Sequence, residues 1–190
     1  MIAAAPGFGG CWPRRVVLAL LAALLAAPGA AHAGDSTPGD LLAVLVPAAA
    51  WGATYLEDDG PGRCQLYHAL GATAGVTYGL KTLVHHRGPD GDTDSFPSGH
   101  TALAFGGAAF LQRRYGWPYG LPAGLAASYV AWSRLDSDQH DLGDVAAGAG
   151  IAIIANLVFA TPREQGVQVE PLVGAGESTV LGLCLRGSLP

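Results

Sequence analysis

Apolar residues gather in one short N-terminal run and in five longer segments that turn-forming residues separate. The short run covers residues 16–27 (VVLALLAALLAA). The longer segments have the length and composition of helices, and they cover residues 40–56, 64–86, 98–114, 120–135 and 140–159. Segments of about 15–20 residues, most with an internal Gly or Pro, suit a packed bundle better than a row of bilayer spans. The pattern therefore predicts an all-α fold, a compact helical bundle of about five core helices.

The sequences between these segments have the composition of turns. Gly, Pro and Asp dominate residues 57–63 (EDDGPGR) and residues 87–97 (RGPDGDTDSFP). The Trp117-Pro118 pair predicts a break between the third and fourth helices, because proline does not continue a helix.

Three glycines in the second segment recur every fourth residue: Gly71, Gly75 and Gly79. Each glycine costs a helix about 1 kcal/mol relative to alanine. Their shared face predicts close approach by a neighbouring helix.

The chain changes character after Thr161-Pro162, where the last helix is expected to end. The tail, residues 166–190, alternates weakly between apolar and polar positions and contains a Gly-Ala-Gly turn at residues 174–176. This pattern is typical of a short β-hairpin. We therefore expect one helical domain over residues 34–165, followed by a tail that can form a hairpin.

The first 33 residues are typical of an export signal. Arg14 and Arg15 precede the apolar run, and residues 31–33 (AHA) offer the small-x-small sequence at which signal peptidase cleaves. About a dozen apolar residues are short for a bilayer span of about 20, and an uncleaved N-terminal anchor is the alternative. The sequence therefore predicts export to the periplasm or cell envelope.

The composition and charge of the chain limit the classes of molecule that it is expected to bind. Half of the residues are hydrophobic and only 13% are charged, which is rich for a soluble protein and lean for a polytopic membrane protein. The net charge of −5 argues against nucleic acid, which binds basic surfaces. Lys81 is the only lysine, so a broad electrostatic membrane patch is not expected, although apolar membrane contact stays open. Export permits a disulfide between Cys64 and Cys184, but the sequence does not show that these cysteines meet.

His140 and Asp144 stand four residues apart at the start of the last expected helix, which begins at His140 or Asp141. Residues four apart lie on one helix face, so Asp144 can accept a hydrogen bond from one ring nitrogen of His140. This contact fixes the tautomer and leaves the other nitrogen free as a nucleophile. Such pairs are also common as surface or capping contacts, so the spacing alone does not establish chemistry.

Two cationic side chains accompany this pair. Arg134 lies six residues before His140, and Lys81 lies near the end of the second segment. The planar fork of a guanidinium matches phosphate oxygens. Taken singly, either residue is a common helix-end cation, because the helix dipole favours positive charge there.

The sequence Pro97-Ser98-Gly99-His100 opens the third segment. Free N–H groups at a helix N-terminus form an anion site. Gly99 allows close backbone approach, Ser98 adds a hydroxyl that can equally be an N-cap, and His100 can give a proton near neutral pH. With the two cations and the His/Asp pair, this set can hold a phosphate, attack it and protonate its leaving group.

Together these blocks resemble the type 2 phosphatidic acid phosphatase superfamily, which also includes bacterial class A acid phosphatases and vanadium haloperoxidases. The family pattern is K-x6-R-P, then P-S-G-H, then S-R-x5-H-x3-D. The second block matches at residues 97–100, and the third matches in full from Ser133 to Asp144. The resemblance covers about residues 68–150.

The first block departs from the pattern. Lys81 and Pro89 are correctly spaced, but Gly88 stands where the family has arginine. Arg87, one residue earlier, can reach the same phosphate oxygen if the loop allows it. Loss of one charge-assisted contact costs about 1.5–3 kcal/mol, which bears on the rate more than on the reaction.

The resemblance implies a role for each residue. His140 is the expected nucleophile, Asp144 orients it, and His100 protonates the leaving group and then activates water. The expected phosphate-binding residues are Lys81, Arg134, Ser98, Gly99 and Arg87. No metal or other cofactor takes part in this scheme.

The resemblance implies an exported phosphatase of phosphomonoesters or diphosphates, with a phosphorylated lipid as the first substrate class. A soluble non-specific acid phosphatase is the alternative. Gly88 motivates a third reading, a catalytically weakened phosphate-binding relic, and a vanadate-dependent peroxidase would use the same pocket. A metal site is disfavoured, although His85, His86, His100, His140 and Asp144 are candidate ligands. The adjacent His85 and His86 point to different sides of a helix, and no H-E-x-x-H or paired-cysteine spacing occurs. The sequence does not indicate the oligomeric state.

Overall fold

The computed structural model describes residues 37–91, 93–163, 168–174 and 180–186. The expected export signal lies outside these residues, as do the side chain of Cys184 and the expected boundary at residue 165. Cys64 is exposed and carries a free thiol. The helices of the described part are α2 (Thr37–Leu56), α3 (Gly60–Leu83), α4 (Gly99–Tyr115), α5 (Trp117–Asp136) and α6 (Leu142–Phe159). The predicted all-α bundle is confirmed.

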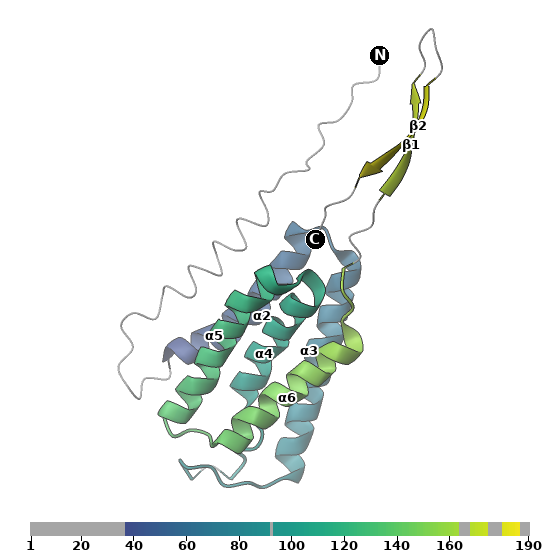
Figure 1. Ribbon diagram of the computed structural model, residues 1–190. Helices are drawn as coiled ribbons and strands as arrows, with labels where there is room; N and C mark the ends of the chain where they lie inside the picture. The colour runs from purple at the N-terminus through teal and green to yellow at the C-terminus, as the bar shows by residue number, and fades with distance from the viewer. Residues whose placement is uncertain (1–36, 92, 164–167, 175–179, 187–190) are drawn as a thin grey trace.

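Helix α4 lies at the centre of the bundle and packs against the other four helices (Figure 1). Alanines supply much of the buried surface and let the helices approach closely. The larger fully buried apolar side chains are Val46, Leu66, Phe110, Leu111 and Val130. Burial of each such side chain stabilises the fold by about 1.5–3 kcal/mol.

The glycine face predicted to pack against a neighbour does not do so. Around Gly71, Gly75 and Gly79, no atom of another element in the described part of the chain lies within 4 Å of where a Cβ would stand. Close backbone approach occurs instead at Gly107 of α4, where a Cβ would lie 2.7 Å from the backbone nitrogen of Pro47. The prediction failed because spacing identifies a shared face but not the face that the tertiary fold buries.

Several helix boundaries differ from the sequence-based expectation. Helix α3 begins at Gly60, inside the expected turn at residues 57–63, and ends at Leu83. The break between α4 and α5 is Gly116 alone, whose φ of 82° favours glycine. Trp117-Pro118 begins α5 rather than interrupting the chain, because proline is well tolerated in the first turn. Helix α6 begins at Leu142 with Asp141 as its N-cap, so His140 lies in the preceding loop and not on the helix.

The tail contains two strands, β1 (Gln168–Gly174) and β2 (Val180–Arg186). They pair antiparallel, with Gln168 opposite Arg186 and Gly174 opposite Val180. This is the region in which the sequence predicts a short hairpin.

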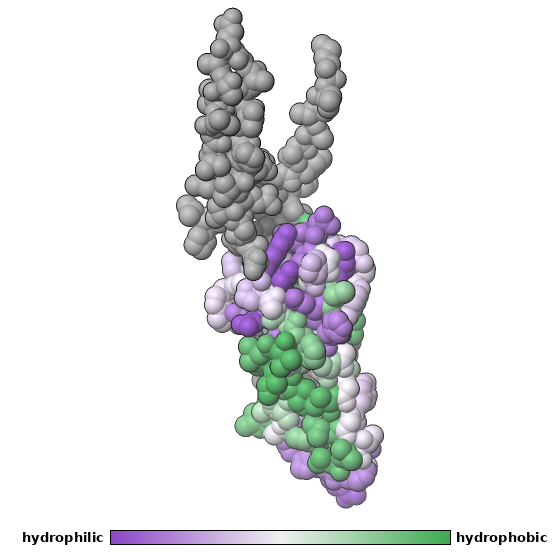
Figure 2. All heavy atoms as spheres, turned by 90° about the vertical axis from the view of Figure 1, so that its right-hand side faces the viewer, coloured by the Kyte–Doolittle hydropathy of each residue, from purple (hydrophilic) through white to green (hydrophobic). Residues whose placement is uncertain are grey.

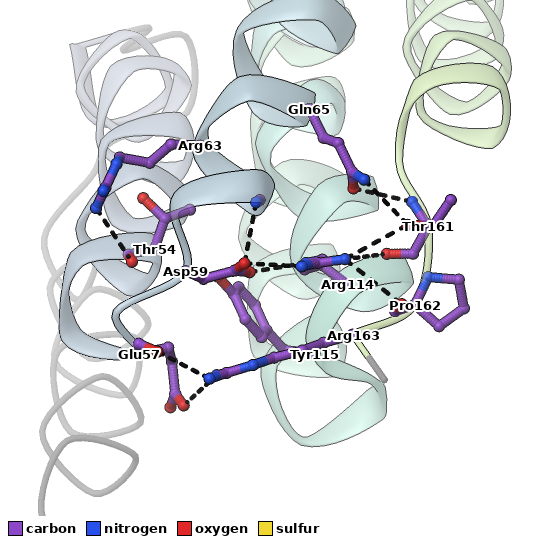
Figure 3. Close-up of polar contacts among 11 residues, drawn as sticks. Thr54, Glu57, Asp59, Arg63, Gln65, Arg114, Tyr115, Thr161, Pro162 and Arg163 are labelled. Atoms are coloured by element: carbon purple, nitrogen blue, oxygen red, sulfur yellow. Dashed lines mark hydrogen bonds and ion pairs between the residues drawn. The ribbon is translucent and has the colours of Figure 1, made fainter. Parts of the chain in front are cut away.

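A buried ion pair closes one end of the bundle (Figure 3). The Asp59 carboxylate accepts hydrogen bonds from Nε and Nη2 of Arg114, both at 2.7 Å, and from the Tyr115 hydroxyl at 2.9 Å. Arg114 Nη1 also donates to the Thr161 carbonyl at 3.0 Å. We call this set the Asp59 clasp. It ties the turn between α2 and α3 to the end of α4 and to the segment after α6.

The clasp perturbs its own carboxyl group. Burial raises the pKa of Asp59, but hydrogen bonds from Arg114, the Gly62 amide and Tyr115 outweigh it and hold the pKa at about 2. Asp59 also caps α3 by accepting from the Gly62 amide at 3.0 Å. The carboxylate therefore stabilises a helix start and a tertiary junction together.

Apolar side chains are exposed along the outer helices. Figure 2 shows them gathered across the middle of the side that carries α3 and α6, with polar residues above and below. On α6, Ile154 is 62% exposed and Val158 is 68% exposed. In the described part of the chain, two helical stretches, Pro38–Leu56 and Leu142–Phe159, are long and apolar enough to cross a membrane. Length and composition alone are weak support for a span, because core helices share these properties.

Candidate active site

The described structure holds a cavity of about 390 Å³ at the end of the bundle away from the Asp59 clasp. Four residues predicted for the site line it: Lys81 from the last turn of α3, Gly99 and His100 from the first turn of α4, and His140 from the loop before α6. The remaining wall is mostly apolar and is formed by Leu70, Thr73, Ala74, Thr77, Tyr78, Ala102 and Leu103. The cavity therefore joins a polar end to an apolar wall between α3 and α4.

His140 is held through one ring nitrogen. Its Nδ1 lies 3.2 Å from Asp144 Oδ2 and 2.9 Å from Ser95 Oγ. Asp144 is fully buried in the first turn of α6, and its side chain also takes part in a capping box with Asp141. The predicted His140–Asp144 contact is present, although a loop and a helix start create it rather than a continuous helix face.

Ser95 fixes the positions of the protons. Its hydroxyl donates to Asp144 Oδ2, so the Ser95 oxygen is left to accept from His140. Nδ1 of His140 must then carry the hydrogen, which it shares between the serine oxygen and the carboxylate. This tautomer leaves the lone pair of His140 on Nε2. The sequence did not single out Ser95, because a serine in an Asp- and Gly-rich loop carries no distinguishing pattern.

The surroundings keep His140 neutral. Burial lowers its pKa, and the positive charges of Lys81 and Arg134 lower it further, while the hydrogen bond and charge of Asp144 act in the opposite direction. A neutral imidazole with a free Nε2 lone pair can act as a nucleophile.

His100 occupies the first turn of α4, next to the free amides of the helix start. Burial lowers its pKa, Arg134 lowers it further, and Asp40 opposes the shift. Its Nε2 lies 3.3 Å from Asp40 Oδ1. Among the described residues, no atom outside the start of α4 lies within 4 Å of where a Cβ on Gly99 would stand, so the backbone there is open to a ligand.

Asp40 lies between Arg134 and His100 and contacts both side chains. The guanidinium is 1% exposed, and Nη1 donates to Asp40 Oδ1 at 2.7 Å and to Gln139 Oε1 at 2.8 Å. Arg134 does not line the cavity; Asp40 connects it to His100. Asp40 lies in the first turn of α2, 94 positions before Arg134, and no motif in the sequence marks it.

Lys81 is held by the loop that precedes α4. Its ammonium group donates to the carbonyl oxygens of Asp94 and Ser95. The same loop therefore positions both the lysine and the hydroxyl that contacts His140.

Besides Arg134, two more predicted phosphate-binding side chains do not line the cavity. Ser98 is fully buried, and its hydroxyl donates to Thr101 Oγ1 at 3.1 Å. Arg87 is exposed and does not line the cavity. Gly88 is buried, and a Cβ there would lie 2.7 Å from Ser95 Oγ.

A second polar cluster lies beside Asp144. His86 Nε2 contacts Asp141 Oδ2 at 2.9 Å, a hydrogen bond that raises the pKa of His86. One ligand atom from each of His86, Asp141 and Asp144 lies within 4.8 Å of the others, close enough to hold a metal ion. His85 is not part of this group, because it pairs with Asp94 at 3.1 Å.

Comparisons with known proteins identify relatives of the chain. The family model of the PAP2 superfamily matches residues 18–165. The chain is 33% identical over 109 residues to a lipid A 1-phosphatase of Porphyromonas gingivalis. This alignment covers 50% of this chain and 24% of that protein. It is 25% identical over 133 residues to a lipid A 1-phosphatase of Helicobacter pylori, and this alignment covers 65% of this chain and 66% of that protein. The chain thus spans from about a quarter to just under two thirds of these relatives. No solved structure matches it significantly.

Proposed function

The chain belongs to the PAP2 superfamily, and on that basis we propose that it is a phosphatase of phosphorylated lipids with His140 as its nucleophile. The observation that carries the proposal is the meeting of Lys81, His100 and His140 at one cavity. The buried Asp144 behind His140 supports the assignment of the nucleophile.

In the first step, Nε2 of His140 attacks phosphorus and the bond from phosphorus to the leaving oxygen breaks. His100 gives its proton to that oxygen, so an alcohol or a phosphate departs. The positive charge that develops on His140 is stabilised by Asp144, whose Oδ1 is buried and has no hydrogen-bond partner among the described residues. A buried carboxylate with one oxygen lacking a hydrogen bond is favoured by a cation beside it.

In the second step, neutral His100 takes a proton from water as the water oxygen attacks phosphorus. The phosphorus–nitrogen bond breaks, and its electron pair returns to Nε2 of His140. Inorganic phosphate leaves. The lowered pKa of His140 favours the neutral nucleophile, and the lowered pKa of His100 makes it a stronger acid.

The phosphate oxygens would contact Lys81, the amides at the start of α4 near Gly99, and Arg134. These groups supply positive charge and N–H donors where negative charge develops. Arg134 does not line the cavity, but Asp40 connects it to His100, which does. The proposed set leaves out the Ser98 hydroxyl, which is buried and donates to Thr101, and Arg87, which is exposed and does not line the cavity.

The apolar wall of the cavity favours a lipid-borne phosphate over a small polar ester. Leu70, Ala74 and Leu103 would contact an acyl chain next to the reacting phosphate. The exposed apolar faces of the outer helices support contact with the membrane that holds such a substrate. We therefore place the enzyme in the cell envelope, associated with the membrane.

The direct test is phosphate release by the purified protein from phosphatidic acid, lipid A and an aryl phosphate, with and without EDTA. We expect release from at least one lipid, retained in EDTA, and an acid-labile phosphoenzyme. His140→Ala should abolish the phosphoenzyme and lower turnover about a thousandfold or more. His68→Ala is the matched control, because His68 is an exposed imidazole outside the cavity.

An active His140→Ala protein would defeat the nucleophile assignment. Hydrolysis of the aryl phosphate without any lipid would favour a soluble acid phosphatase. Loss of activity in EDTA would contradict the metal-independent mechanism and favour a metal ion at His86, Asp141 and Asp144.

A further inference from the structure

One carboxylate oxygen joins two groups of the candidate site. Asp40 Oδ1 accepts from Arg134 Nη1 at 2.7 Å and lies 3.3 Å from His100 Nε2. The proposed function assigns the first group to phosphate binding and the second to proton donation. An anion therefore already occupies a donor that a phosphate oxygen would need.

The backbone of α2 holds this carboxylate in place. A Cβ on Gly39 would lie 2.1 Å from Ser133 Oγ and 2.8 Å from Arg134 Nη2. The first turn of α2 thus packs directly against the start of the Ser133-Arg134 motif. The only way for the carboxylate to leave without moving the helix is rotation of the Asp40 side chain.

Asp40 and Arg134 differ sharply in exposure. The Asp40 side chain is 47% exposed, whereas that of Arg134 is 1% exposed. A buried guanidinium is costly without an anion beside it. Asp40 supplies that anion when no phosphate is bound, and its exposure lets the side chain turn toward water when a phosphate arrives.

We propose that Asp40 is an internal competitor of the phosphate group. Its carboxylate holds the Arg134 N–H in the ligand-free protein, yields it to a phosphate oxygen on binding, and takes it back as inorganic phosphate leaves. This inference rests on the proposed function, because it requires Arg134 to bind phosphate.

Internal competition has a consequence for specificity. Two anions that share one donor repel each other. The affinity for phosphate is therefore reduced by the small fraction of molecules in which the Asp40 side chain has turned away from Arg134. Free phosphate gains affinity only from the polar end of the cavity, whereas a lipid substrate gains further binding energy from the apolar wall. Asp40 therefore disfavours retention of product more than binding of substrate.

The test compares the affinity for inorganic phosphate of the wild-type protein and of Asp40→Asn. Affinity is measured by titration calorimetry and as competitive inhibition of aryl phosphate hydrolysis. We expect Asp40→Asn to bind phosphate about tenfold more tightly, because the amide keeps the shape and removes the competing charge. Asp138→Asn is the matched control: Asp138 is an exposed acid two residues from His140, and asparagine tolerates its φ of 52°.

Unchanged or weaker binding of phosphate by Asp40→Asn would overturn the inference and make Asp40 a structural partner of Arg134. If Asp40→Asn does not fold, as judged by circular dichroism, Asp40→Ser takes its place with the same expected gain. If the wild-type protein hydrolyses phosphate esters and both variants bind phosphate with the wild-type affinity, only the role of Asp40 is refuted. A wild-type protein that neither hydrolyses esters nor binds phosphate refutes the proposed function as well.

Discussion

Ser95 contacts both members of the proposed nucleophile pair, His140 and Asp144. Ser95→Ala should lower kcat by about ten- to a hundredfold, because loss of a hydrogen bond to a charged group costs about 1.5–3 kcal/mol. KM should change little, since Ser95 does not line the cavity. Steady-state kinetics with an aryl phosphate provide the measurement. Ser128→Ala, on the exposed face of α5, is the control, and a loss confined to KM would contradict the assignment.

Gly88 stands where the family has a phosphate-binding arginine. The sequence leaves open whether Arg87, one residue earlier, takes the place of that arginine. The structure shows a buried glycine against Ser95, where even a Cβ would come within 2.7 Å of the serine oxygen. An arginine at this position would displace the side chain that contacts His140. The glycine in place of the family's arginine therefore allows Ser95 to pack against the backbone at this position.

The motifs identified Lys81, Gly99, His100 and His140, which meet at the cavity, because those residue types and spacings are rare by chance. They did not identify Ser95 or Asp40. Both act through contacts with residues at least 45 positions away in the chain. A single sequence does not encode such distances in any periodic pattern, so only the folded arrangement shows these contacts.

The helices themselves were predictable, while their ends were less so. Apolar spacing located all five described helices. The start of α5 at Trp117 and of α6 at Leu142 depended on caps, Gly116 and Asp141, that the apolar pattern does not contain. The face of α3 with Gly71 was misjudged for a related reason, since only neighbouring elements determine which face is buried.

The Asp59 clasp connects three elements and predicts a pH-dependent stability. The pKa of Asp59 is about 2 in the folded protein, below its ordinary value of 3.8. A lowered pKa means that the stabilisation is complete above about pH 4 and is lost as the pH falls toward 2. Thermal unfolding across this range should show the loss in the wild-type protein.

Asp59→Asn should lower the free energy of unfolding by about 3–5 kcal/mol near neutral pH, because it leaves Arg114 buried with no carboxylate. The same variant should lose the part of the acid sensitivity that Asp59 causes. Asp58→Asn is the control, since Asp58 is exposed and its φ of 48° suits asparagine. Equal effects of the two substitutions would show that the clasp does not stabilise the fold.

For the molecule as a whole, the cavity and the Asp59 clasp lie at opposite ends of a bundle whose outer helices expose large apolar side chains. We expect the protein to stay with the membrane fraction in high salt and to be released by detergent, because salt screens charge but not apolar contact. Ile154→Lys should shift the protein toward the soluble fraction, since Ile154 is 62% exposed on α6. Ile154→Val is the control. Release of the wild-type protein by salt alone would argue against apolar membrane contact.

Backbone atoms join the two segments that carry the histidines. The Ser98 amide donates to the Asp144 carbonyl at 3.0 Å. At Gly148, a Cβ would lie 2.5 Å from the Ser98 carbonyl oxygen, so α4 and α6 touch main chain to main chain. Replacing an imidazole, a hydroxyl or a carboxylate at this end leaves that main-chain junction intact. The relative position of α4 and α6 at this end therefore depends partly on main-chain contacts that no side-chain substitution removes.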